Sequence, residues 1–413
     1  MYRSYCIFVF CFIVLPFKLF PQDSTIAVNE APPINTIKED TPKEKKKISD
    51  VLQVRGYLKD MQTVFITEKG NTLSHNFYHL RLNAKAYISK SITAAVESRT
   101  RMFYGELVRA TPGFAQAIGA DDGYVDLTEL FVDNEAFAFA TTIDRLWLNW
   151  SGKKFDIRLG RQRINWGLNL VWNPNDLFNA YNFLDFDYEE RPGADAVRLQ
   201  YYVGDMSSVE LAAKFSKNPD STVVAGMYKF NKWEYDFQVL GGVYYEDLTL
   251  GLGWAGNLKT AGFKGEANYF HPRDYFADTA GILNASVSMD YTFKKPIYLN
   301  GSILYNSAGI TDLSDLGAVQ SQTFFTNISA KNLMPTQFSF FGQVNSTVST
   351  LLKVDLGAIY GAGLNLLVAI PSVTYSLKQN WELVLIGQLF FIEYAGKFGN
   401  AGNYVFLRLK WSY

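Results

Sequence analysis

The sequence predicts an all-β fold, a transmembrane antiparallel β-barrel. Three observations lead to it: an alternating C-terminal strand, an N-terminal export signal, and alternating segments between them. The chain ends in NYVFLRLKWSY, where apolar and polar side chains alternate with the period of a strand. The apolar face consists of Val405, Leu407, Leu409, Trp411 and Tyr413. A terminal strand of this kind needs an apolar medium for its face and partners for its edge. A closed barrel in a membrane supplies both.

The N-terminus, residues 1–22, predicts a secretory signal peptide. One early cation, Arg3, precedes an apolar run over residues 5–17, and the polar stretch PQDS follows. The run is too short for a stable membrane span, although an N-terminal membrane anchor is the alternative reading. Both cysteines, Cys6 and Cys11, lie in this segment, so the mature chain is expected to rely on no disulfide and no thiolate metal site.

Composition excludes several function classes. Aromatic residues make up 16% of the chain and the formal net charge is -1, so nothing indicates nucleic acid as a partner. The chain has 3 histidines and none of the common hydrolase, metalloprotease or phosphate-loop patterns, so we expect no enzyme, no metal and no cofactor. The remaining enzyme hypothesis is an outer-membrane hydrolase using Ser74 with His75 or His79.

Residues 23–50 predict a flexible periplasmic linker. The stretch NEAPPINTIKEDTPKEKKK carries proline and charge but almost no apolar side chain, so it cannot bury enough surface to order itself. A binding role for its basic end is the alternative.

Residues 51–413 predict the barrel itself, with about 18 strands and 16 as the alternative count. The expected strands are 51–66, 73–89, 92–105, 138–151, 155–165, 194–204, 208–216, 221–231, 233–245, 248–256, 260–270, 281–293, 297–306, 336–345, 351–360, 365–377, 381–392 and 403–413. Connections after even strands are short, whereas several after odd strands are long. This asymmetry predicts short periplasmic turns, long outer loops and both termini in the periplasm of a Gram-negative bacterium.

The polar faces of the strands predict a charged lumen, because a charge on the lipid face costs about 2–4 kcal/mol near the midplane. The predicted pore-lining residues are Arg81, Lys85, Glu97, Arg99, Arg101, Arg145, Asp156, Arg158 and Arg198. The loop 166–193 is acidic and is expected to form a constriction through Asp176, Asp185, Asp187, Glu189 and Glu190. A basic wall facing an acidic loop would select solutes by charge; the alternative is that these charges pair and plug a narrow barrel.

One segment, RLGRQRINWGLNLVWNPNDLF at 158–178, is more distinctive than the rest. Its predicted rim motif consists of Arg161, Gln162, Arg163, Trp166 and Gly167. The segment resembles bacterial outer-membrane porin-like proteins, in the style of alginate-export channels, whose strands carry GRQ and then WG before an NP-containing loop. The overall style is similar to that of Bacteroidota sequences. The motif either anchors the loop at the rim, where Trp166 and Trp172 are expected, or contacts solute through Arg161 or Arg163.

These observations predict an outer-membrane channel for passive diffusion of small hydrophilic solutes, with anions as one candidate class, through an arginine-lined lumen. The expected partners are outer-membrane lipid, the solutes, and the barrel assembly machinery, for which Tyr413 and Trp411 look like the insertion signal. The alternative is a plugged structural or surface-binding barrel, receptor-like or adhesin-like, that uses the loops 106–137 and 307–335.

Overall fold

The computed structural model describes residues 51–180, 193–274, 276–312, 328–394 and 396–413. The predicted signal peptide and linker lie outside these residues. The strands are β1 (Leu52–Ile66), β2 (Thr72–Tyr87), β3 (Ile92–Gly105), β4 (Thr128–Asn134), β5 (Phe137–Ser151), β6 (Phe155–Gln162), β7 (Ala194–Gly204), β8 (Ser207–Phe215), β9 (Val223–Lys232), β10 (Tyr235–Tyr244), β11 (Asp247–Leu258), β12 (Ala261–Pro272), β13 (Ile282–Thr292), β14 (Ile297–Asn306), β15 (Phe338–Thr347), β16 (Leu352–Gly361), β17 (Leu366–Lys378), β18 (Trp381–Tyr394) and β19 (Lys397–Ser412).

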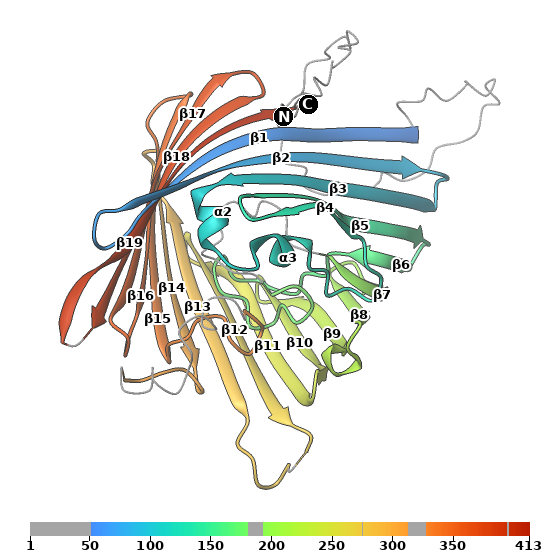
Figure 1. Cartoon of the computed structure of the whole chain (residues 1–413). Coiled ribbons are helices and arrows are strands. Elements are labelled where there is room, and N and C mark those ends of the chain that lie inside the picture. Colours follow the sequence, from blue (N-terminus) through green and yellow to red (C-terminus); the bar gives the residue numbers. More distant parts are fainter. Residues whose placement is uncertain (1–50, 181–192, 275, 313–327, 395) are drawn as a thin grey trace. The chain divides into compact units, whose positions relative to one another are not determined.

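The strands form one closed antiparallel barrel. Each pairs with the next along the chain, except that β3 pairs with β5, and β1 pairs with β19 to close the ring. In Figure 1 the blue N-terminal strands therefore lie beside the red C-terminal ones. Of the 19 described strands, 18 form the ring, and β4 is an addition that pairs with β5. The predicted all-β barrel with 18 strands is confirmed.

Three described elements in the connection 106–137 were not predicted. They are α2 (Glu106–Ala110), α3 (Phe114–Gly119) and β4. Figure 1 draws the two helices within the ring of strands. A 3-10 helix, η1 (Pro219–Ser221), lies between β8 and β9. Within the described part of the chain, no helix is long and apolar enough to span a membrane.

Burial in the wall is inverted relative to a water-soluble protein. On β5 the side chains of Leu146, Leu148 and Trp150 are exposed, whereas Asp144 and Asn149 on the other face are buried. Polar residues therefore face the lumen and apolar residues face outward, as a membrane requires. Trp381 and Trp411 are register partners whose rings stack at 6.0 Å, which suits the periplasmic interface.

The tight turns explain several local choices. β9 ends at Lys232 and β10 begins at Tyr235, so the connection has only Trp233 and Glu234, with φ values of 55° and 63°. Two consecutive positive φ values match a type I′ hairpin turn, whose twist fits that of the flanking strands. The unfavourable free energy of positive φ at these non-glycine residues is offset by the strand pairing on both sides of the turn.

The wall is irregular beyond the end of β6 and the start of β7. β6 ends at Gln162, so the outer half of β5 has no β6 partner and pairs with β4 instead, from Thr128 opposite Thr142. The backbone N–H of Ile143 then donates to Leu127 O, and Gly123 forms an isolated bridge with Ser216 beyond β8. Residues 121–134, here called the wall insert, thus extend from β5 to the end of β8.

Candidate functional site

The chain leaves the wall after β6 and crosses the lumen as residues 163–180, here called the lumen loop. Trp166 Nε1 donates to Glu210 Oε1 on β8 at 2.6 Å, and Gln238 Nε2 on β10 donates to Trp166 O at 2.8 Å. Asn175 Nδ2 reaches Leu252 O on β11 at 2.8 Å. The loop is therefore tied to several successive strands of one side of the barrel. Trp166 and Trp172 are buried inside the lumen, not at the rim where the sequence placed them.

One carboxylate, that of Glu266 on β12, holds the backbone of the lumen loop at two places. Its Oε1 accepts the N–H groups of Leu168 and, at 2.7 Å, of Asn169. Its Oε2 accepts the N–H of Asn175 at 2.9 Å. Glu266 is only 1% exposed. Hydrogen bonds to a charged acceptor are stronger than neutral ones, so this residue fixes both the outgoing and the returning arm of the loop.

The wall and loop are shaped for this close approach. A Cβ on Gly251 would lie 2.6 Å from Asn175 Oδ1, and one on Gly167 would lie 2.4 Å from Asn173 Oδ1. A side chain at Gly251 would push the loop off the wall, and one at Gly167 would force apart two segments of the loop itself. The ring of Trp166 packs edge-on against Phe178 at 4.8 Å within a buried apolar cluster that includes Leu240. The lumen loop is therefore an ordered, packed element.

Part of the 307–335 connection also folds against the inner wall. Asn284 Nδ2 on β13 donates to Ala330 O at 2.8 Å, and Asn306 Nδ2 on β14 donates to Lys331 O at 3.3 Å. Lys331 itself forms an ion pair with Asp247 at the start of β11. Residues 328–335 thus lie on the inner side of the wall, against β13, β14 and the start of β11.

Three of the predicted pore-lining arginines lie on β2 and β3, namely Arg81, Arg99 and Arg101. Arg81 lies between Asp144 on β5 and Glu97, with its Nη2 at 2.7 Å from Glu97 Oε2, and it is fully buried. Arg99 Nη2 is 3.2 Å from Asp144 Oδ1. Arg101 donates to Ile118 O of α3 at 2.8 Å. Arg81 and Arg99 thus share one aspartate, and Arg101 lies beside them against α3.

A second charged group lies nearer the periplasmic end, where Arg158 and Arg198 are register partners on β6 and β7. The Arg158 guanidinium lies over the Trp147 ring at 4.2 Å, and its Nε donates to Asn149 Oδ1. Arg198 Nη2 is 2.7 Å from Glu210 Oε2, the carboxylate that also holds Trp166. Positive charge on the wall is thus linked to the position of the lumen loop.

The other predicted residues take varied places. Lys85 lies over the Tyr87 ring at 5.0 Å, Asp156 accepts hydrogen bonds from Asn149 and Ser151, and Arg145 is buried and donates to Asp144 O. Of the predicted constriction acids, Asp176 lies in the lumen loop and is 1% exposed. The others, Asp185, Asp187, Glu189 and Glu190, lie outside the described residues.

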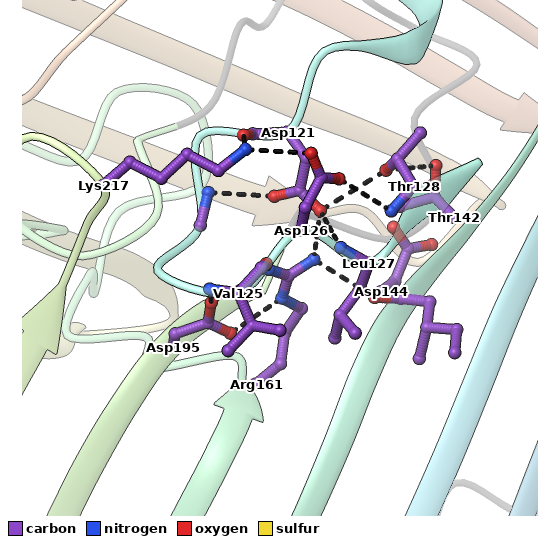
Figure 2. Close-up of polar contacts among 12 residues, drawn as sticks. Asp121, Val125, Asp126, Leu127, Thr128, Thr142, Asp144, Arg161, Asp195 and Lys217 are labelled. Atoms are coloured by element: carbon purple, nitrogen blue, oxygen red, sulfur yellow. Dashed lines mark hydrogen bonds and ion pairs between the residues drawn. The ribbon is translucent and has the colours of Figure 1, made fainter. Parts of the chain in front are cut away.

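Within the rim motif, Arg161 faces the wall insert. Its guanidinium contacts Asp121 Oδ2 at 2.7 Å, Asp195 Oδ1 at 2.8 Å and Val125 O at 2.5 Å, as Figure 2 shows. Gln162 Nε2 donates to Ala196 O at 2.9 Å, and Arg163 is exposed at the start of the lumen loop. Trp166 and Gly167 belong to the loop itself. The motif therefore combines a wall anchor with the base of the loop.

The wall insert has a second, exposed tie. Lys217, beyond β8, donates to Asp126 Oδ2 at 2.9 Å, and this hydrogen bond lowers the pKa of Asp126 below its ordinary value and raises that of Lys217. A carboxyl with a lowered pKa contributes its stabilisation above its unfolded pKa and loses it as pH falls through the lowered value.

We expect this tie to hold at neutral pH and to be lost only in acid, below about pH 4. Limited proteolysis of the wall insert as a function of pH measures this. Wild type should become more sensitive in acid, whereas Lys217→Met should show a smaller change. Equal acid sensitivity in both would contradict the assignment.

A lumen cavity of ≈ 380 Å³ lies between the basic wall and the lumen loop. Its lining includes Arg99 and Arg101, the acids Asp121 and Asp144, and Phe178 of the lumen loop. Cationic, acidic and apolar groups thus meet in one space, which can hold a small polar solute. Within the described residues, no group of three or more His, Cys, Asp or Glu side chains could hold a metal ion.

Comparisons with known proteins locate the fold. No protein-family model matches the sequence, and no curated protein matches it. Among solved structures, OccAB4 of Acinetobacter baumannii matches over 88% of this chain and 98% of its own, with 10% identity and a TM-score of 0.55. OccK9 (OpdG) of Pseudomonas aeruginosa covers the same shares at 11% identity and a TM-score of 0.57.

The fold is that of an outer-membrane porin-like barrel. Its apolar outer face requires a membrane around the wall. OpdL of Pseudomonas aeruginosa, at 9% identity and a TM-score of 0.52, covers 89% of this chain and agrees with the same fold. At such identities the likeness extends to the fold alone.

Sequence reasoning missed the residues that hold the lumen loop. Glu210, Gln238 and Glu266 all fall on inward faces of correctly predicted strands, so their alternation gave a signal that they face the lumen. Their partner is the lumen loop, which is distant in the sequence: Leu168 and Glu266 are 98 residues apart. No local sequence pattern indicates contacts over such a separation.

Proposed function

We propose that the protein is a passive diffusion channel for small hydrophilic solutes, with a preference for anions. The observation that carries the proposal is that Arg99 and Arg101 line the lumen cavity, where Arg99 shares Asp144 with the buried Arg81. Positive groups on a low-dielectric wall focus the field and raise the local concentration of anions. Arg158 and Arg198 continue the positive wall toward the periplasm.

The lumen loop gives this field a narrow space in which to act. Because Glu266, Glu210 and Gln238 hold the loop on β8, β10 and β12, a solute would pass between the loop and the basic wall, where the lumen cavity lies. A solute passing there exchanges part of its hydration for contacts with guanidinium groups, which favours carboxylates and phosphates over cations.

The test is single-channel current from the refolded mature chain in a planar bilayer under a salt gradient. Wild type should give a reversal potential that favours anions, and Arg99→Ala with Arg101→Ala should shift it toward cations. Arg273→Ala is the matched control, because this exposed arginine contacts Tyr245 O and Glu246 O in an outer loop and lies outside the lumen. An unchanged reversal potential in the double variant would refute the arginine-lined pathway.

The plugged or surface-binding barrel is supported by one observation. The lumen loop and residues 328–335 both fold inward and form a continuous buried cluster through Trp172, Leu333 and Met334. If folded protein carries no current, this packed interior is a plug, and the outer connections become the binding surface.

The proposal extends to export and assembly. Residues 1–22 would direct the chain out of the cytoplasm, and the barrel assembly machinery would read Tyr413 and Trp411. In support, Tyr413 exchanges backbone hydrogen bonds with Gly56 at the closing edge, so the last residue takes part in the ring. We also propose that the GRQ and WG signature relates the chain to the porin-like proteins that carry it, and that the protein originates from a member of the Bacteroidota.

A further inference from the structure

The outer face of the barrel is hollow beside the wall insert. A cavity of ≈ 280 Å³ opens there between β5, β6, β7 and the insert. Its apolar lining includes Tyr124, Val125, Leu146, Leu159, Val197 and Phe215. Tyr124 is 65% exposed and Leu159 is 58% exposed, so these side chains stand at the rim of the hollow and not in a core. We call this cavity the outer groove.

The groove exists because the wall insert is not a regular strand. In a bilayer every backbone polar group must find a partner within the protein. Here charged side chains make the hydrogen bonds to the backbone of the insert that a neighbouring strand would otherwise make. Val125 O accepts from Arg161, and Val125 N–H donates to Asp195 Oδ2 at 3.0 Å. Asp121 accepts from the N–H groups of Gly123 and Leu127 at 2.9 and 2.8 Å.

This arrangement leaves the apolar lining of the groove on the outward side, next to the lipid-facing surface. Arg161 and Asp195 also line the groove but bond to the backbone of the insert, whereas the side chains of Tyr124 and Val125 are exposed. Leu146 and Leu159 lie in mid-wall on strands whose outward residues form the lipid-facing surface. A second apolar hollow of ≈ 410 Å³ on β7–β10 shares Val197 with the groove, so the concave face continues along the barrel.

We propose that the outer groove binds one acyl chain of an outer-membrane lipid. A flat wall contacts an acyl chain on one side only. A groove surrounds the acyl chain, which adds dispersion contacts and buries more apolar surface. The lipid-facing surface is continuous with the groove, so the acyl chain can enter the groove from the bilayer without crossing a polar rim. The inference rests on the fold and is independent of what the channel conducts.

Native mass spectrometry of the delipidated, folded barrel titrated with dipalmitoyl phosphatidylethanolamine tests the proposal. Wild type should retain one lipid. Leu159→Trp, which fills the groove from the lipid side, should weaken that binding by about tenfold or more. Val354→Trp is the matched control, because Val354 is an exposed lipid-facing residue on β16, away from the groove. Heat-modifiable gel mobility establishes that each variant is folded.

Equal lipid retention in all three proteins would overturn the proposal, because the bound lipid would then be unspecific annular lipid. A multimer mass that Leu159→Trp abolishes would also overturn it, and would assign the groove to a second copy of the chain. Conductance is measured on the same preparations, so a failure of the channel proposal is distinguishable from a failure of this one.

Discussion

Replacing Glu266 with glutamine should raise the unit conductance of the channel. The carboxylate accepts three backbone N–H groups from the two arms of the lumen loop. A glutamine amide has one acceptor oxygen, and its NH₂ group would face N–H donors at the other arm. Each buried donor left without an acceptor costs about 1–3 kcal/mol, so one arm should detach from β12 and enlarge the path.

The measurement is single-channel conductance together with protease sensitivity of the lumen loop. Asp290→Asn is the matched control, since Asp290 is a lumen-facing carboxyl on the neighbouring strand β13 whose described ion pair is with Lys264 at 3.7 Å. The control removes the same charge without touching the loop and should leave the conductance close to wild type. If both variants changed conductance alike, the effect would come from lumen charge and not from loop anchoring.

Replacing Arg161 with methionine should produce a large loss of stability. The Arg161 side chain is 5% exposed, and those of Asp121 and Asp195 are 7% and 12% exposed. Removing one partner of a buried ion pair leaves an uncompensated charge and costs about 3–5 kcal/mol. The wall insert would also lose the donor to Val125 O, so we expect the section of wall beyond the end of β6 and the start of β7 to open first.

Heat-modifiable mobility on gels and protease cleavage within the wall insert measure this loss. Arg161→Lys keeps the charge but lacks the planar fork that reaches both carboxylates, so it should fall between wild type and Arg161→Met. Lys217→Met removes the exposed tie to Asp126 and should have little effect at neutral pH. A stable Arg161→Met barrel with an uncut insert would show that β4 alone holds this section of wall.

The alternation of side chains, together with the lengths of the connections, predicted every strand of the ring, because lipid and lumen impose opposite demands on the two faces. The same rule could not predict β4, α2 and α3, since the connection 106–137 is short of apolar alternation and rich in acids. Nor could it predict where β6 ends. Gly160, at φ 113°, distorts the end of that strand, and Arg161 then turns to carboxylates that are distant in sequence.

The sequence predicted which strands carry the charged residues of the candidate site, but not which of these residues contact one another. The arginines on β2 and β3 were expected side by side, and Arg81 and Arg99 are indeed register partners. That Asp144 would lie between them was not predictable, because the pairing of β3 with β5 shifts register between Glu97 and Ser98. A bulge of this kind changes which residues meet without leaving a signal in the alternation.

The closure of the ring by β1 and β19 also sets the order in which the molecule can be completed. The pairing runs from Tyr57 opposite Ser412 to Ile66 opposite Asn403, so it joins the two ends of the folded chain. Pairs this distant in sequence carry the largest loop-closure entropy and form late. Until they form, β19 presents a free edge next to an apolar face, which is a template for aggregation. The last step of assembly is therefore also the step most in need of a chaperone.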